Sequence, residues 1–204
     1  MRAIVLMLLA IASAVVPLGA QDRLPPIPAD AMTAPQRQAV ADFRTARKAE
    51  LTGPFIPLLR SPEVMSRTRA LGDYLRYQTK LGPRHSEFVI LMAARSWSQQ
   101  YEWAVHYPIA IKAGVTPDVA TAIAERRRPA EMTSDEATLY DFCDELMRTQ
   151  AVGDATYARM TAAFGEQGVI DTVGIVGYYT MLAMVLNTAR TPPPANGAPP
   201  LPMP

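Results

Sequence analysis

The sequence predicts an all-α fold, a compact bundle of about six to eight helices. Signals for helix starts and stops recur along the middle of the chain. No stretch keeps the alternation of apolar and polar residues, with a period of two, that is typical of a β-strand. The chain has 204 residues, of which 49% are hydrophobic, and this suits the core of one helical domain.

Capping residues and helix breakers indicate the helices in order. A Thr-x-Pro start opens the first, and the sequence TGPFIP ends it. A Ser-Pro-Glu start opens the second, and a Gly-Pro pair ends it. Gly114 stands in the C-terminal capping position of the fourth, and Thr-Pro-Asp, Ser-Asp-Glu and Asp starts follow. The expected helices cover residues 33–51, 61–80, 83–98, 99–113, a short stretch from 116, 134–149, 154–165 and 169–189.

The last expected helix, 169–189, is apolar on nearly all sides. Such a helix belongs inside a bundle or in a subunit interface. Gly174 and Gly177 weaken it in isolation, but they let a neighbouring helix approach closely. We expect its methionines to pack in the core and not to bind a ligand.

Both ends of the chain differ in character from this domain, which we place at residues 33–190. Residues 1–20 have the layout of a secretory signal peptide, with Arg2 before an apolar run and cleavage plausible after Ala20. An uncleaved anchor is the alternative, but the apolar run is shorter than the ~20 residues that span a bilayer. We therefore expect an exported protein, periplasmic or secreted, with no stable membrane span after cleavage. Residues 21–32 form a Pro-rich lead-in, and residues 191–204 form a Pro-rich tail that we expect to be a solvent-exposed linker.

Charge and cysteine content exclude several classes of function. The net charge of +1 argues against a nucleic-acid-binding protein, and the basic run Arg126–Arg128 is expected to be a solvated turn. Cys143 is the single cysteine, so no disulfide can form within the chain. It lies in an amphipathic stretch, and we expect a buried, inert thiol.

The stretch SWSQQYEWAVHYPIAIKAG, residues 96–114, holds the residues most suited to chemistry. Glu102 and His106 lie four residues apart, on one face of a helix. A carboxylate near a helix N-terminus tends to stay ionised, so we expect Glu102 to be charged and to orient the imidazole. The pair could act as a general acid and base, or it could be an ordinary surface pair. One helix offers too few ligands for zinc, and we expect no metal.

The spacing Glu87, Gln99, Glu102 and His106 extends this pattern. The segment resembles the carboxymuconolactone decarboxylase/alkylhydroperoxidase-like superfamily over about residues 35–190. The redox members of that superfamily carry cysteines where this chain has Gln99 and Glu102, so the sequence looks like the non-cysteine, decarboxylase-like branch. Peroxidase activity is disfavoured because the two-cysteine motif is absent.

The resemblance implies an alkylhydroperoxidase-like bundle and a lyase that needs no cofactor. Its chemistry would be decarboxylation, or a related lactone or carboxylate proton transfer, on a small anionic metabolite. His106 would be the acid/base, Glu102 would orient it or share its proton, and Glu87 would complete the network. The expected substrate-binding residues are Gln99, Arg84, Arg95, Tyr101 and Tyr179.

The resemblance also implies rings of subunits, trimers or hexamers. The alternative is a non-catalytic helical module that uses the same cleft for ligand binding or for oligomer assembly. A geometric condition tests the site. The Glu87 carboxylate should reach Glu102 or His106 within hydrogen-bond distance.

Overall fold

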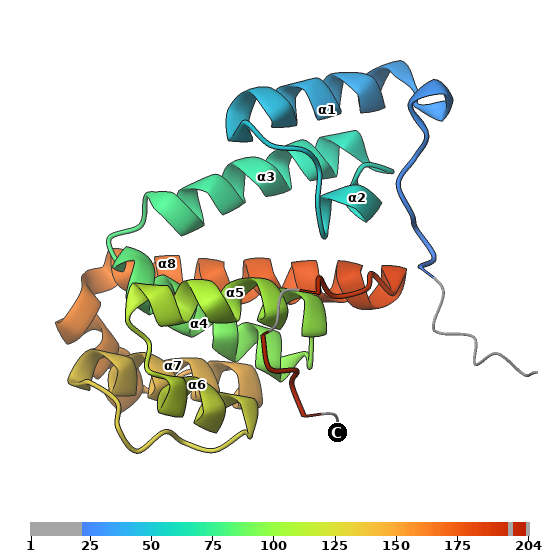
Figure 1. The fold of residues 1–204 in the computed structure, drawn as a ribbon. Helices are drawn as coiled ribbons and strands as arrows, with labels where there is room; N and C mark the ends of the chain where they lie inside the picture. The colour runs from blue at the N-terminus through green and yellow to red at the C-terminus, as the bar shows by residue number, and fades with distance from the viewer. Residues whose placement is uncertain (1–21, 196–197, 203–204) are drawn as a thin grey trace, which may run out of the picture.

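The computed structural model describes residues 22–195 and 198–202, and within these ranges the fold is all-α with no strand (Figure 1). The predicted fold class is therefore confirmed. The predicted signal peptide, residues 1–20, lies outside the described residues. In order the elements are the 3-10 helix η1 (Ala29–Ala31), α1 (Ala34–Arg47), α2 (Phe55–Leu58), α3 (Pro62–Tyr77), α4 (Gly82–Ser96), α5 (Gln100–Ala113), α6 (Pro117–Ala124), α7 (Ser134–Thr149) and α8 (Asp154–Ala189).

Capping residues explain where several helices begin and end. Thr33 and Thr133 form complete capping boxes at the starts of α1 and α7, in each case with the side chain three residues later. The side chain of Thr116 caps α6. Gly114 ends α5 with a φ of 104°, a left-handed conformation that glycine adopts without strain.

Several bounds differ from the prediction, and the helix predicted over residues 61–80 already ends at Tyr77. The first helix ends at Arg47, before residue 51, because Lys48 adopts a left-handed conformation and closes it. The sequence TGPFIP does interrupt the chain, but its second half forms the short helix α2. The last two predicted helices are joined as α8, with a break at Gly165, whose φ and ψ of 68° and 173° are not helical.

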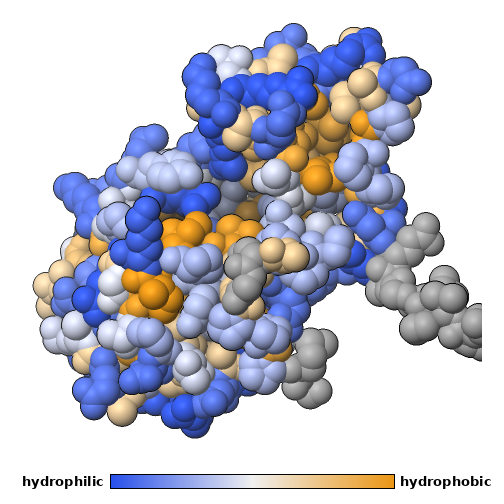
Figure 2. Space-filling view, viewed as in Figure 1, coloured by the Kyte–Doolittle hydropathy of each residue, from blue (hydrophilic) through white to orange (hydrophobic). Residues whose placement is uncertain are grey.

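Helix α4 lies at the centre of the fold. Its residues from Ser86 to Arg95 are all buried, and it packs against α5, α7 and α8. In Figure 1, α1, α2 and α3 form a layer on one side of α5 and α8, while α6 and α7 lie on the opposite side. Figure 2 shows the face in view hollowed between the α1–α3 layer and the rest of the bundle. The two layers meet around this hollow, so side chains from both can reach it.

Helix α8 is the one helix among the described residues that has the length and hydropathy to cross a membrane. A core helix passes the same test, and 56% of the apolar window of α8 is buried within the fold. Its buried Asp171 accepts a hydrogen bond from the Tyr74 hydroxyl at 3.0 Å. The helix thus joins the α1–α3 layer to the remainder of the bundle.

Cys143 of α7 is fully buried and unpaired, and burial raises the pKa of its thiol far above the ordinary value. The thiol therefore stays protonated at neutral pH, as the sequence predicted.

The prediction that the Pro-rich tail is a solvent-exposed linker is wrong for Leu201, which is buried, although Pro199, Pro200 and Pro202 are exposed. The Trp103 indole donates a hydrogen bond to the Pro199 carbonyl oxygen at 3.0 Å. Gln100 pairs with both backbone groups of Leu201, donating to its oxygen at 2.9 Å and accepting from its nitrogen at 3.0 Å. Leu201 itself is 2% exposed. The prolines cannot form a helix, but the backbone groups of Pro199 and Leu201 find hydrogen-bond partners on side chains of α5.

We predict that Leu201→Ala lowers the free energy of unfolding by about 2 kcal/mol, because it removes a fully buried side chain from the core. Urea unfolding followed by circular dichroism measures this change. Pro202→Ala is the matched control, since Pro202 is exposed and should leave the stability unchanged. Equal stability of Leu201→Ala and the wild type would mean that the tail is not docked in solution.

Candidate functional site

A buried hydrogen bond between α4 and α5 forms the centre of the candidate site. His106 of α5 and Glu87 of α4 lie 2.7 Å apart, from Nδ1 to Oε2. Each of the two side chains is only 7% exposed. The geometric condition set by the sequence is therefore met, with Glu87 as the partner of His106. The catalytic roles of both residues stay predictions.

Contacts on the ring fix the orientation of His106. With Glu87 as a carboxylate, Nδ1 carries a proton and donates it, because a carboxylate only accepts. The Tyr179 ring from α8 meets the imidazole edge to face, with centroids 5.0 Å apart and planes at 87°. Among the described residues, Nε2 of His106 has no hydrogen-bond partner, and His106 lines a cavity. This nitrogen is therefore available to a ligand.

The cavity beside His106 lies between the α1–α3 layer and helices α5 and α8, and its volume is about 110 Å³. Loop residues 52–54 and Phe55 contribute one wall, and aromatic side chains contribute another. Its polar side chains come from four helices. They are Arg47, Arg76, Tyr101, Glu102, His106, Tyr178 and Tyr179.

The structure corrects the prediction that Glu102 is ionised and orients His106. Glu102 is 3% exposed, and neither carboxylate oxygen has a hydrogen-bond partner among the described residues. Burial raises the pKa of Glu102 well above its ordinary value. A helix N-terminus stabilises a carboxylate by only about 0.3–1 kcal/mol, and here the desolvation of the buried carboxyl group outweighs this effect. Burial therefore favours the neutral acid form of Glu102.

The structure also places the two predicted arginines elsewhere. Arg84 forms an ion pair with Glu136 of α7 at 2.9 Å, which supports the start of that helix. Arg95 lines a different cavity and donates to the Ser98 hydroxyl at 2.9 Å. Proximity to Glu87 along the sequence misled the prediction, because the partners Glu136 and Ser98 hold the two guanidinium groups away from the cavity beside His106.

The arginines that line the cavity beside His106 are instead Arg47 of α1 and Arg76 of α3. The sequence analysis missed both. Arg76 lies 3.9 Å from Glu87, from Nη2 to Oε1, and its buried Nε has no partner among the described residues. Burial opposes the charge of Arg76, but Tyr179, Tyr77 and Glu87 together raise its pKa. Arg47 pairs with Asp73 at 2.8 Å and stacks on Phe55. Neither arginine belongs to a local motif, so no spacing signal could have found them.

Of the other predicted binding residues, Tyr101 and Tyr179 line the cavity and Gln99 does not. Gln99 caps α5 with its side-chain oxygen, and its amide donates to Asn187 Oδ1 at 2.8 Å. Its role is thus structural. Tyr101 packs over Gly53, where an added Cβ would lie 2.7 Å from the Tyr101 ring. Gly53, in the TGP sequence, is therefore required for the ring to cover the cavity.

Tyr178 is a third cavity residue that the sequence analysis missed. Its hydroxyl fits against Gly72 of α3, where an added Cβ would lie 2.1 Å away. Burial, partly offset by Arg47, raises the pKa of Tyr178 to about 12, so the phenol keeps its proton. The two adjacent tyrosines in GYYT were the sequence feature that could have pointed to Tyr178.

Within the described residues, no group of three or more His, Cys, Asp or Glu side chains could hold a metal.

Comparisons with known proteins agree with this architecture. Residues 62–140 match the model of the carboxymuconolactone decarboxylase family. No curated protein matches the sequence at a significant level. Several solved structures share the fold at sequence identities too low to indicate more than the fold.

Three of these structures illustrate the likeness. The first is the alkylhydroperoxidase AhpD core, an uncharacterized peroxidase-related protein from Ralstonia eutropha JMP134. It is 18% identical to this chain with a TM-score of 0.66, and the match covers 85% of this chain and 92% of that protein. An uncharacterized peroxidase-related protein from Silicibacter sp. TM1040 is 13% identical with a TM-score of 0.67, and the match covers 86% of this chain and 93% of that protein. The debrominase Bmp8, a cysteine-to-alanine variant in complex with 2,3,4-tribromopyrrole, is 9% identical with a TM-score of 0.66, and the match covers 86% of this chain and 94% of that protein. Residues 62–140, across α3 to α7, thus match the carboxymuconolactone decarboxylase family model, and the three structures share the AhpD-like helical fold with this chain.

Proposed function

We propose that the cavity beside His106 carries out cofactor-independent general acid/base chemistry on a small anionic metabolite, by decarboxylation or a related proton transfer. One observation carries the proposal. A buried carboxylate, Glu87, holds His106 at 2.7 Å, and the other ring nitrogen is left free at a cavity lined by two arginines. A histidine oriented in this way can accept a proton and return it during a reaction.

Each side chain would have a defined part in a decarboxylation. The bond to the departing carboxylate breaks, CO₂ leaves, and the electron pair moves into a lactone carbonyl of the substrate. Nε2–H of the protonated His106 then delivers a proton to the carbon. Glu87 stabilises the imidazolium, and Arg47 or Arg76 binds a remaining carboxylate of the substrate.

Glu102 would have a different part from the one its position in α5 suggested. As a neutral acid it can donate a hydrogen bond, which a carboxylate cannot do. The acceptor would be the oxygen on which negative charge develops when CO₂ leaves. A carboxylic acid kept neutral by an apolar site is an established way to stabilise such an oxyanion.

Peroxidase chemistry of the two-cysteine type stays disfavoured. Gln99 and Glu102 occupy the cysteine positions, and the buried Cys143 lies on α7 with a pKa too high for thiolate chemistry. The structural likeness to the debrominase bound to 2,3,4-tribromopyrrole supports the idea that this fold can hold a small cyclic ligand.

A non-catalytic binding module is the second candidate. The cavity volume of about 110 Å³ is below the range of about 300–1,000 Å³ usual for ligand sites, and Tyr101 covers part of it. These features suit retention of a small ligand. The two candidates differ in one outcome, because a binding module keeps its ligand when His106 is replaced, whereas a catalyst loses turnover.

We predict that His106→Gln lowers kcat at least about 100-fold on any lactone or carboxylate of a substrate panel that the wild type converts. Gln keeps the size and polarity but cannot transfer a proton. His85→Gln is the matched control, because His85 contacts Leu81 and Asp135 and does not line the cavity. Normal turnover by His106→Gln, measured as CO₂ release or loss of substrate, would rule out the acid/base role.

The raised pKa of Glu102 predicts a pH dependence of stability. The folded protein retains a proton that the unfolded chain releases near its ordinary pKa of 4.5. The free energy of unfolding should therefore fall as pH rises above about 4.5, by up to about 1.4 kcal/mol per pH unit. Glu102→Gln removes this contribution, so its stability relative to the wild type should increase between pH 5 and pH 8. Urea unfolding at both pH values measures the difference, and a constant offset would contradict a neutral Glu102.

We further propose that the protein is exported and forms a homo-oligomer, a trimer or hexamer, through α8. Ile170, Val173 and Met184 are 68%, 41% and 43% exposed. At 100° per residue they lie within about 60° of one another around the helix axis. An exposed apolar stripe of this kind is typical of a protein–protein interface.

The oligomer proposal predicts that a charge on this stripe lowers the mass of the particle. Met184→Glu should convert the assembly to smaller species in light scattering, because an unpaired carboxylate would be buried at the interface. Val64→Glu is the control, since Val64 is an exposed apolar residue on α3. A wild type that is monomeric at all concentrations would refute the proposal.

A further inference from the structure

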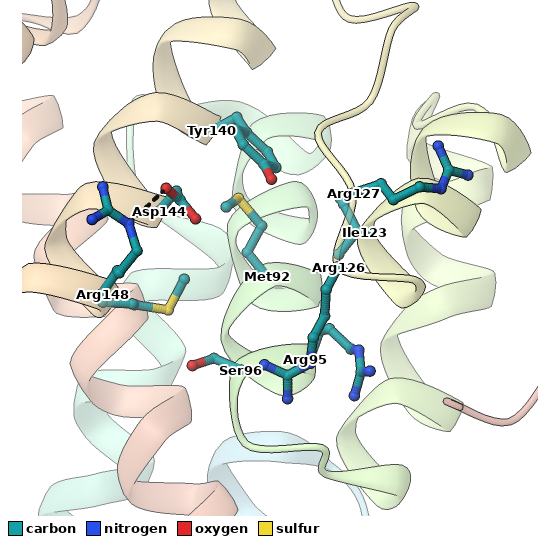
Figure 3. A pocket seen from close by; sticks show the side chains of 10 residues that line it. Met92, Arg95, Ser96, Ile123, Arg126, Arg127, Tyr140, Asp144 and Arg148 are labelled. Carbon is teal, nitrogen blue, oxygen red and sulfur yellow. Dashed lines mark hydrogen bonds and ion pairs between the residues drawn. The ribbon is translucent and has the colours of Figure 1, made fainter. Parts of the chain in front are cut away.

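A second cavity, of about 320 Å³, is bounded by the end of α4, the end of α6 and the outer face of α7 (Figure 3). It shares no lining residue with the cavity beside His106. Its volume falls within the range of sites for small organic ligands. The proposed acid/base chemistry has no use for it, so it requires a separate explanation.

The charges around this second cavity are unbalanced. Four arginines and one carboxylate line it. Arg148 pairs with that carboxylate, Asp144, at 3.5 Å, and Arg127 pairs with Glu125. In Figure 3, Arg127 points away from the cavity, whereas Arg95 and Arg126 come together at one end of it. The uncompensated positive charge is therefore concentrated at that end.

Arg95 and Arg126 form no ion pair within the described part of the chain. Both donate to one acceptor, the Ser98 hydroxyl, at 2.9 Å and 3.3 Å. Two guanidinium groups carry ten N–H donors, and one hydroxyl oxygen can satisfy few of them. The pair thus leaves a fork of donors for which the protein supplies no carboxylate.

The burial of Arg95 makes this arrangement costly without a ligand. The residue is 7% exposed, and its Nε has no hydrogen-bond partner among the described residues. Burial, reinforced by the charge of Arg126, lowers the pKa of Arg95. An unsatisfied donor on a buried charge is destabilising, and a bound oxyanion would relieve both the missing partner and the repulsion.

Apolar side chains also line the cavity. They are Met92, Ile123, Met147 and the Tyr140 ring. Methionine side chains adapt to flat or irregular ligands, and an aromatic ring adds stacking surface. A ligand that fits the whole cavity would have an apolar body and one anionic end.

We propose that this cavity is a second ligand site, which binds a small molecule with an apolar body and a terminal oxyanion. Arg95 and Arg126 bind the oxyanion, and Met92, Tyr140 and their neighbours hold the body. Guanidinium forks match carboxylate and phosphate groups equally well, so the shared chemistry of the anionic group defines the ligand class.

Isothermal titration calorimetry on the full chain tests this site with benzoate and phenyl phosphate as probes. At least one of them should bind, more weakly at high salt, while neutral benzyl alcohol and inorganic phosphate should bind at least tenfold more weakly. Stronger binding of phenyl phosphate would identify a phosphate ester as the ligand class, and stronger binding of benzoate a carboxylate. Failure of both probes to bind would overturn the proposal.

Arg126→Asn tests the assignment to this cavity. Arg126 is exposed and has a φ of 58°, and asparagine tolerates this left-handed conformation, so the fold should be kept. The affinity for the better probe should fall at least tenfold. Arg67→Gln, at an exposed arginine of α3, and His106→Gln should leave the affinity unchanged. An unchanged affinity of Arg126→Asn, or an equal loss in His106→Gln, would show that the probe binds elsewhere.

Discussion

The buried hydrogen bond between Glu87 and His106 is the interaction on which the rest of the site depends. Removing a carboxylate and an imidazole from water is costly unless each is the partner of the other. This pairing fixes the distance between α4 and α5, because 2.7 Å leaves little freedom at the contact. Arg76 from α3 and Tyr179 from α8 then approach the same pair. Four helices are thus held around one hydrogen bond, and the cavity forms where they meet.

Glu87 and Glu102 show how partners, and not helix position, decide the state of a carboxyl group. Both are buried near the same imidazole. Glu87 has His106 and Arg76 within reach, whereas Glu102, one turn before His106, has no partner among the described residues. One helix pair therefore offers an ion-pairing carboxylate and a neutral hydrogen-bond donor. A single acid/base centre needs both kinds of group when a reaction moves a proton and develops an oxyanion.

Features that depend on neighbouring residues, such as helix bounds, could be predicted from the sequence. Features that depend on the packing of distant helices could not. Thr33, Thr116 and Gly114 set helix bounds through hydrogen bonds within a few residues, so their capping signals can be recognised in the sequence. The Glu87 to His106 spacing was informative because α4 and α5 are neighbours in sequence and in space. Arg47 and Arg76 reach the cavity only through the packing of the α1–α3 layer, and no local pattern records this. Burial of Glu102 and docking of Leu201 likewise depend on the complete tertiary structure.

The docked tail has a consequence for the order in which the chain folds. Gln100 and Leu201 are separated by 101 residues, and the first turn of α5 that carries Tyr101 and Glu102 is held partly by this contact. During synthesis, α4 and α5 leave the ribosome long before residues 198–202 exist. The hydrogen bond between Glu87 and His106 can form early, but the contacts of Gln100 and Trp103 with the tail can form only after the whole chain has been made. Contacts between such distant residues are slow to form, so the start of α5 receives its last support late in folding.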